Sequence, residues 1–189
     1  MLQKCENRTD EELVSLSLKD QEFFYCLLSR FEDKLLRYLF RTFSFSREDA
    51  EDVLQESFLK IYKNLNEFDY SFKFSSWAYR IVHNEAVSFL RKAKSKSGQN
   101  SYLSDEEFEK ISSDINLEKE VDRKYSKEKI ESVLKNLEEK YREVLVLKFL
   151  EDKSYEEISD IVKKPVGTVA TLINRAKKQF KKIIEENHV

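Results

Sequence analysis

The sequence predicts an all-α protein built from two small helical domains joined by a flexible linker. One proline and two glycines in 189 residues leave little of the turn chemistry that strands require. Apolar residues recur instead at three- and four-residue steps, which is typical of amphipathic helices. A stretch rich in Ser, Asn and acidic residues interrupts this pattern in the middle of the chain. We therefore expect a first domain at 9–94, a linker at 95–125 and a second domain at 126–187.

The first domain is expected to open with two amphipathic helices. Thr9 is followed three residues later by Glu12, a spacing typical of a capping box at a helix start. Leucines and phenylalanines then recur at helical spacing as far as Phe40, with a break near Lys19 and Asp20. This apolar stripe is predicted to form core.

A third helix is predicted in "SREDAEDVLQESFLKIYKNL", which begins with the good N-cap residue Ser46. Its apolar face, predicted to pack into the core, holds Val53, Leu54, Phe58, Ile61, Tyr62 and Leu65. Another face is polar and mostly acidic, with Asp49, Asp52, Gln55, Glu56 and Lys60. On these residues alone, a solvated face is the simpler interpretation and a partner-binding face is the alternative.

The next segment, "NEFDYSFKFSSWAYRIVHNEAVSFLRKAKSK", mixes aromatic and basic side chains. Aromatic rings stack on unpaired bases while cations hold phosphates, so this composition suits separated nucleic-acid strands. An ordinary helical core is an equal alternative for residues such as Trp77. The alternation of Phe68, Tyr70 and Phe72 with polar residues, in a predicted loop with little core to fill, favours the nucleic-acid interpretation.

The end of the chain predicts a helix-turn-helix. Ser154 is a natural N-cap for a short helix, and Pro165 suits the start of the next one because the first turn needs no N–H there. Residues 163–182 hold seven cations and no acid, although the whole chain has a net charge of -2. A basic second helix after a short turn is typical of a helix that enters the major groove, and a helical hairpin with a solvated basic tail is the alternative. Its free side is predicted to present Thr168, Thr171, Asn174, Arg175 and Lys178.

Nothing in the sequence indicates catalysis, a cofactor or a metal site. Cys5 and Cys26 lack metal-binding spacing, and we expect both to remain thiols in a reducing cytosol. There is no glycine-rich phosphate loop and no nucleophile paired with a base. No stretch approaches the length of a membrane span, and the N-terminus has no signal-peptide core. A cytoplasmic protein that is not an enzyme and does not insert into membranes is therefore expected.

Three stretches in combination resemble the sigma factors of bacterial RNA polymerase, in the compact extracytoplasmic-function (ECF) group of the sigma-70 family. They are "DAEDVLQESFLKIYKNL", "FKFSSWAYRIVHNEAVSFLRK" and "LEEKYREVLVLKFLEDKSYEEISDIVKKPVGTVATLINRAKK". The resemblance implies that the two domains are sigma regions 2 and 4. It implies a protein that binds core polymerase through the largest subunits, recognises two promoter DNA elements and helps to melt the nearer one. It also implies an anti-sigma factor that holds the protein inactive.

The resemblance, taken together with the helix faces described above, assigns three sets of residues. The set expected to bind core polymerase lies on the third helix: Asp49, Asp52, Gln55, Glu56 and Phe58. The set expected to bind the melted minus-ten element combines family positions with the aromatic and basic residues described above: Phe68, Tyr70, Phe72, Lys73, Trp77, Tyr79, Arg80, Asn84 and Arg91. The set expected to bind the minus-thirty-five element lies on the last helix: Thr168, Thr171, Asn174, Arg175, Lys177 and Lys178.

Two departures from the family pattern affect the last domain. Ala170 and Leu172 stand where relatives usually carry basic residues, so base readout is expected to rely more on shape or phosphate contacts. Lys163 stands where helix-turn-helix proteins often have glycine, which would cost about 1–2 kcal/mol if the backbone is left-handed there.

Two other functions fit part of the sequence. A helix-turn-helix regulator that works without polymerase would explain the last fifty or so residues but would leave the aromatic segment without a role. A helical adaptor that binds a protein partner through the acidic helix would leave the basic helix unexplained.

Overall fold

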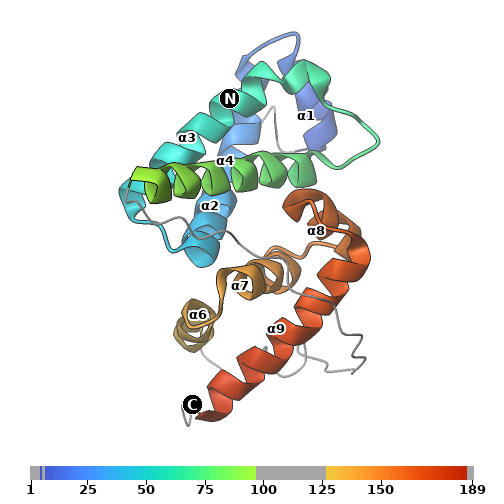
Figure 1. The fold of residues 1–189 in the computed structure, drawn as a ribbon. Helices are drawn as coiled ribbons and strands as arrows, with labels where there is room; N and C mark the ends of the chain where they lie inside the picture. Colours follow the sequence, from blue (N-terminus) through green and yellow to red (C-terminus); the bar gives the residue numbers. More distant parts are fainter. Residues whose placement is uncertain (1–4, 6, 97–126, 187–189) are drawn as a thin grey trace.

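The computed structural model describes residues 5, 7–96 and 127–186, and these form helices and their connections (Figure 1). The prediction of an all-α fold with two helical parts is confirmed. Residues 7–96 form the N-terminal half and residues 127–186 the C-terminal half, which lies below it in Figure 1. The linker expected at 95–125 falls outside the described residues apart from its first two positions.

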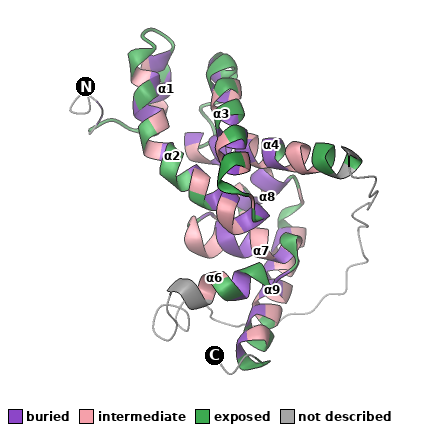
Figure 2. Cartoon of the chain, turned by 90° about the vertical axis from the view of Figure 1, so that its left-hand side faces the viewer, coloured by how far each residue is buried: buried purple, intermediate pink, exposed green. Residues whose placement is uncertain are grey.

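The N-terminal half contains four α-helices and one short 3-10 helix among its described residues. These are α1 (Asp10–Ser17), α2 (Glu22–Phe43), α3 (Arg47–Lys63), η2 (Leu65–Glu67) and α4 (Phe74–Lys96). Helix α1 packs on α2, and α3 packs on both α2 and α4. The buried faces of these helices are turned toward one another (Figure 2), so the amphipathic pattern of the sequence accounts for their packing.

The starts of these helices follow the predicted caps. The Thr9 hydroxyl accepts a hydrogen bond from the Glu12 N–H (3.1 Å), and the Glu12 carboxylate accepts one from the Thr9 N–H (2.8 Å). The Ser46 hydroxyl accepts from the Asp49 N–H (3.1 Å) at the start of α3. The break expected near Lys19 is also present, because α1 ends at Ser17 and α2 begins at Glu22.

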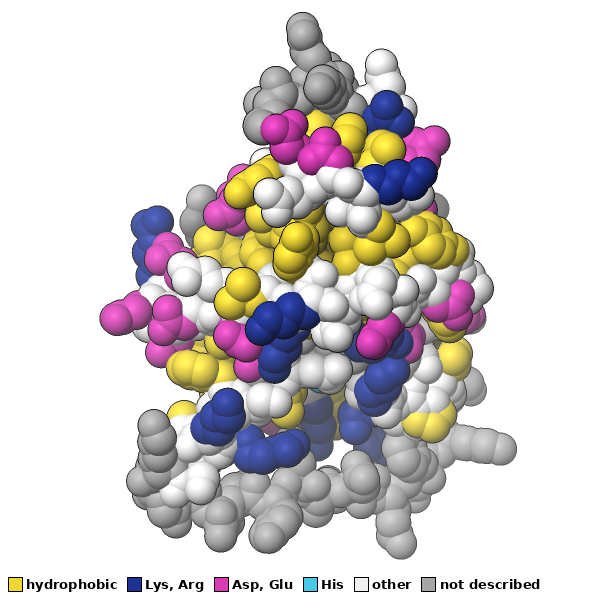
Figure 3. Space-filling view, turned by 90° about the horizontal axis from the view of Figure 1, so that it is seen from above, with side chains coloured by type: hydrophobic (Ala, Val, Ile, Leu, Met, Phe, Trp, Pro, Cys, Tyr) yellow, Lys and Arg dark blue, Asp and Glu magenta, His cyan; other side chains and the backbone are white. Residues whose placement is uncertain are grey.

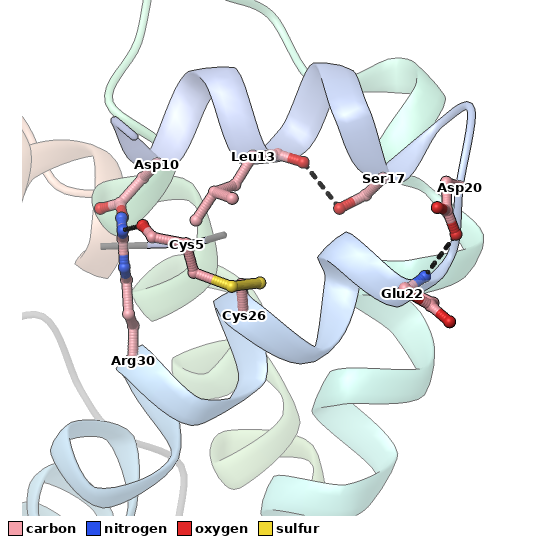
Figure 4. Close-up of a disulfide and its surroundings, with 8 residues drawn as sticks. All are labelled: Cys5, Asp10, Leu13, Ser17, Asp20, Glu22, Cys26 and Arg30. Carbon is pink, nitrogen blue, oxygen red and sulfur yellow. Dashed lines mark hydrogen bonds and ion pairs between the residues drawn. A yellow bond between two sulfur atoms is a disulfide. The ribbon is translucent and has the colours of Figure 1, made fainter. Parts of the chain in front are cut away.

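A disulfide joins Cys5 to Cys26 of α2, so the expectation of two free thiols was wrong (Figure 4). The turn between α1 and α2 folds the chain back, and the two Cα atoms come within 5.9 Å, inside the range that a disulfide spans. Arg30 reinforces the same junction, because its guanidinium donates to the Asp10 carboxylate (2.7 Å) and to the Cys5 carbonyl. Sequence spacing alone does not reveal this proximity.

The C-terminal half contains four α-helices and one π-helical turn among its described residues. These are α6 (Lys127–Lys135), α7 (Glu139–Leu145), η3 (Val146–Leu150), α8 (Tyr155–Val162) and α9 (Val166–Glu186). Helix α9 packs on α7 and α8 through a buried stripe of Val169, Ile173, Ala176, Phe180 and Ile184.

Helices α8 and α9 form the predicted helix-turn-helix. The Ser154 hydroxyl accepts from the Glu157 N–H (3.2 Å), which completes a capping box at the start of α8. Helix α8 ends at Val162, and its C-cap residue Lys163 adopts the left-handed conformation (φ 54°, ψ 43°). The strain anticipated at this lysine is therefore present, and the Lys164 N–H donating to the Ser159 carbonyl (3.2 Å) helps to hold the turn.

The two halves pack against each other. Helix α4 lies across α8, and α2 contacts α6, α7 and η3 (Figure 1). In the described parts of the chain, none of the helices has the length and apolar character needed to cross a membrane.

Candidate nucleic-acid and polymerase interfaces

The acidic face of α3 is turned to solvent. Asp52, Gln55 and Glu56 are exposed. Asp49 is half-buried, and its carboxylate accepts a hydrogen bond from the Ser46 hydroxyl (2.7 Å). Phe58 differs from the others, since it is half-buried and packs against the core. Four of the five residues expected to bind polymerase are therefore polar groups on one surface, and the fifth supports the helix beneath them.

Exposed apolar side chains extend this surface, and the sequence reasoning missed them. Leu59 and Tyr62 follow on α3 and are 53% and 45% exposed, although Tyr62 was predicted to lie in the core. Tyr25 of α2 is also exposed, and the ring of its neighbour Phe24 contacts Tyr62 with centroids 5.0 Å apart. Hydrophobic side chains gather on the face of the N-terminal half seen in Figure 3. Gln55, Leu59 and Tyr62 follow one another at four- and three-residue steps. This helical spacing indicates that they share one face of α3, and it was the signal that the sequence offered.

The aromatic segment divides into buried and exposed rings. Phe68, Trp77 and Tyr79 are buried, and the Phe68 ring lies 5.5 Å from that of Trp77. Tyr70 and Phe72, in the loop before α4, are 54% and 50% exposed. Phe68 was expected in a loop with little core to fill, but its side chain is buried. The 3-10 helix η2 just before it turns the side chain inward. Only the two exposed rings are accessible for stacking in this conformation.

An open groove runs beside these two rings. It lies between the start of α1 and the loop before α4, and its lining includes two carboxylates as well as two cations and the rings: Thr9, Asp10, Glu11, Arg30, Tyr70, Phe72 and Lys73. The groove is fixed from the α1 side, because the Glu11 carboxylate accepts a hydrogen bond from the Phe74 N–H (3.0 Å) at the start of α4. Arg30 is paired with Asp10, so Lys73 is the exposed cation beside the two rings. Rings next to a cation suit an unpaired base and its phosphate.

Three of the predicted minus-ten residues, Lys73, Tyr79 and Arg80, meet the C-terminal half. Both oxygens of the Asp160 carboxylate accept hydrogen bonds from Arg80 Nη1, at 2.8 and 3.0 Å. Lys73 Nζ lies 3.3 Å from Glu157 Oε1. The Tyr79 hydroxyl donates to the Glu151 carboxylate. Asn84 and Arg91, farther along α4, are exposed.

More polar contacts hold the same junction. The Ser76 hydroxyl donates to Glu157 Oε1 (2.9 Å), and Lys153 Nζ donates to the Ser75 hydroxyl (3.0 Å). Near α2, the carboxylate of Glu143 lies 2.5 Å from His83 Nδ1. The junction therefore contains several charged or hydrogen-bonded pairs that join residues far apart in the sequence.

The centre of this junction is poorly solvated. Burial raises the pKa of the Tyr79 hydroxyl and the pKa of the Glu151 carboxyl. Burial also lowers the pKa of the Lys153 ammonium, whose nitrogen lies 4.6 Å from the centre of the Tyr79 ring. Each shift disfavours the charged form, so the contacts there are more costly to break or to leave unpaired than surface contacts.

The outward side of α9 carries the residues predicted to read DNA. Lys178 is exposed, and the other five members of the set are half-buried: Thr168, Thr171, Asn174, Arg175 and Lys177. Two of them make local contacts. The Thr171 hydroxyl donates to the Gly167 carbonyl (2.9 Å), and Lys177 Nζ lies 5.3 Å from the centre of the Phe149 ring. All six lie outside the buried stripe of the helix.

The start of α9 is open to a partner. A side chain added at Gly167 would meet nothing within 4 Å, so its glycine is not required by packing inside the protein. Open space at the N-terminal turn of the second helix leaves room for a phosphate backbone to approach. Among the described residues, no group of His, Cys, Asp and Glu is arranged to hold a metal ion.

These features describe an all-helical protein with a helix-turn-helix and a separate exposed polar face on α3. Two family models match the chain, sigma-70 region 2 over residues 27–96 and sigma-70 region 4 over residues 127–180. The ECF sigma factor SigW of Bacillus subtilis is 33% identical over 173 residues, which cover 88% of this chain and 91% of the relative. The ECF sigma-E factor of Haemophilus influenzae is 32% identical over 188 residues, covering 96% and 98%.

Solved structures show the same fold. CnrH in complex with the cytosolic domain of CnrY has a TM-score of 0.67 and 22% identity, covering 94% of this chain and 97% of that chain. The sigma factor RpoE in complex with the anti-sigma factor NepR from Bartonella quintana has a TM-score of 0.64 and 19% identity, covering 86% and 96%. The chain belongs to the ECF sigma factors of the sigma-70 family, which direct RNA polymerase to promoters.

Proposed function

We propose that residues 9–94 bind core polymerase and the melted minus-ten element, while residues 126–187 bind the minus-thirty-five element. The observation that carries this proposal is the exposed polar face of α3. Asp52, Gln55 and Glu56 lie outside the core and are not among the groups that join the two halves. A helix-turn-helix regulator that works alone gives no role to the exposed apolar side chains of Leu59 and Tyr62, which continue this face.

The proposed minus-ten surface begins at the groove beside Tyr70 and Phe72. Their exposed rings are suited to stack on bases that leave the duplex, and Lys73, Asn84 and Arg91 supply polar and cationic groups along the same side. Unstacking a base pair costs a few kcal/mol per step, which stacking on protein rings offsets in part. The protein is proposed to carry out no chemical reaction of its own and to act in the cytoplasm.

The proposed minus-thirty-five reader is α9. Its outward residues follow the open N-terminal turn, and Arg175 and Lys178 are placed to meet phosphates or base edges. The two solved structures described above each contain a bound partner, and one of those partners is named an anti-sigma factor. An anti-sigma factor is therefore the proposed regulator of this chain as well.

The first test is run-off transcription with core polymerase from the host and a pooled library of host promoters. The protein should produce discrete transcripts, and a Gln55→Ala/Glu56→Ala variant should lose most of them because the polymerase contact is removed. Lys63→Ala, at the exposed end of the same helix, is the matched control and should behave like the wild type. Tight duplex binding without polymerase, together with no transcripts, would favour the regulator instead.

A second test separates DNA binding from an adaptor function. Arg175→Ala/Lys178→Ala should weaken binding to a promoter found in the first test and should flatten its salt dependence, since fewer counterions are released. Lys181→Ala/Lys182→Ala removes the same charge farther along α9 and should have the smaller effect. Unchanged DNA binding in the first variant would support the adaptor.

A further inference from the structure

We propose that carboxylates of the C-terminal half occupy, on α4, the positions that promoter DNA takes in the active protein. This inference rests on the proposed function, because it needs Lys73, Tyr79 and Arg80 to be part of the minus-ten surface. Each of these three residues contacts a carboxylate from the other half of the chain: Glu157, Glu151 and Asp160 respectively. We call this set of contacts the carboxylate clasp.

The arginine contact places an anionic group on the guanidinium that is proposed to hold DNA. Arg80 holds both oxygens of Asp160 through Nη1, and their side chains are only 26% and 22% exposed. A carboxylate and a phosphate present similar pairs of anionic oxygens to a guanidinium. While Asp160 is bound, Nη1 of Arg80 is engaged, and a DNA phosphate must compete with this carboxylate for the guanidinium.

Glu157 makes the second contact of the clasp and joins two groups at the start of α4. It accepts from the Ser76 hydroxyl (2.9 Å) and pairs with Lys73 (3.3 Å). The same residue caps α8, because Glu157 Oε2 accepts from the Ser154 N–H (2.8 Å). The capping box therefore fixes this carboxylate in the position from which it reaches α4.

Glu151 makes the third contact and covers the hydroxyl of Tyr79. Its side chain is only 7% exposed, and Arg41 Nη1 lies 3.7 Å from Glu151 Oε1. This contact is the least solvated of the three, whereas Lys73 remains 73% exposed. The clasp thus combines one contact shielded from solvent with two that water and salt reach. It favours the closed arrangement, in which α8 packs on α4, but allows the two halves to separate.

The clasp covers only part of the proposed DNA surface. Tyr70 and Phe72 are exposed in the loop, and Asn84 and Arg91 are exposed farther along α4. Between these two accessible regions, DNA must replace α8 before it reaches Arg80. Only open molecules bind separated strands through Arg80, so the apparent affinity equals the intrinsic affinity multiplied by the fraction of molecules that are open.

The test compares two charge reversals in the full chain. Asp160→Lys replaces the attraction to Arg80 by repulsion, and Glu185→Lys makes the same charge change at an exposed position near the end of α9. Asp160→Asn is the milder variant, in case the reversal impairs folding, and helix content is checked for all three by circular dichroism. Small-angle X-ray scattering measures opening as an increase in radius of gyration. Fluorescence anisotropy measures binding to a labelled pool of randomised single-stranded DNA.

The clasp predicts that both Asp160 variants expand and bind the single-stranded pool more tightly, by about fivefold for the reversal, because the open fraction rises. Glu185→Lys should not expand and should gain less affinity. Asp160 variants with the wild-type radius, or an equal gain in affinity from Glu185→Lys, would overturn the clasp. Run-off transcription by the wild-type protein tests the proposed function separately, since a functional sigma factor without expansion in the variants would refute the clasp alone.

Discussion

Single residues decide how the N-terminal segment is held. Cys5 and Cys26 are linked, and Arg30 binds both the Cys5 carbonyl and the Asp10 carboxylate. The sequence predicted the cap at Thr9 correctly because a capping box is a local signal. It did not predict the disulfide, since that link depends on how α1 folds back on α2.

Loss of the disulfide should destabilise the N-terminal half. The two cysteines are 21 positions apart, and closing a loop of that size is expected to contribute about 3 kcal/mol to the free energy of unfolding. Cys26→Ser should show this loss in urea unfolding under oxidising conditions. Wild-type protein with reductant should match the variant, and the variant should not respond to reductant. A wild-type transition that is the same with and without reductant would show that the link does not form in solution.

Strain at a single lysine should be measurable as well. Lys163 has a positive φ, which glycine adopts without a steric penalty. Lys163→Gly should therefore raise the melting temperature, with a gain in the free energy of unfolding of up to about 1 kcal/mol. Lys164→Gly, next to it, is the control and should lower the melting temperature. A decrease for both variants would mean that the Lys163 side chain contributes more than the strain costs.

At the level of elements, the sequence predicted which helices form and where they are capped better than it predicted which side chains are exposed. The starts of α1, α3 and α8 follow Thr9, Ser46 and Ser154, because each cap involves neighbours three residues apart. Two aromatic residues lie in the environment opposite to the one expected: Tyr62 is exposed and Phe68 is buried. Helical periodicity places a residue on a face, but which residues at the edge of that face are covered depends on the neighbouring helix.

At the level of the whole molecule, the contact between halves could not be predicted from the sequence. Arg80 and Asp160 are 80 positions apart, and nothing local to either residue indicates the other. The family resemblance assigned Arg80 to DNA, and the structure adds that this arginine already has an anionic partner within the chain. Pairings of this kind follow from tertiary packing, not from patterns along the chain.

The junction should respond to pH through Glu151. Burial raises the pKa of this carboxyl, so the folded state binds its proton more strongly than the unfolded state does. The associated stability is present below the unfolded pKa of about 4.3 and is lost as the pH rises through the higher folded value. Glu151→Gln should therefore gain stability relative to the wild type as the pH rises above about 4.3, because the wild-type carboxyl must ionise in its buried site.

Urea unfolding at several pH values measures this difference. Glu185→Gln, which removes an exposed carboxyl, is the control and should show a much smaller change over the same range. A difference between Glu151→Gln and wild type that does not vary with pH would contradict the effect of burial.

The outward position of α3 has a consequence for the order of assembly. Its polar face is exposed while Arg80 is engaged by Asp160, so a protein that binds α3 has access to the closed molecule and a DNA strand that needs Arg80 does not. Polymerase would then meet the factor first, and opening would follow within the assembled enzyme. Chromosomal DNA offers a vast excess of nonspecific sites, and these sites would compete poorly with polymerase for the unassembled protein.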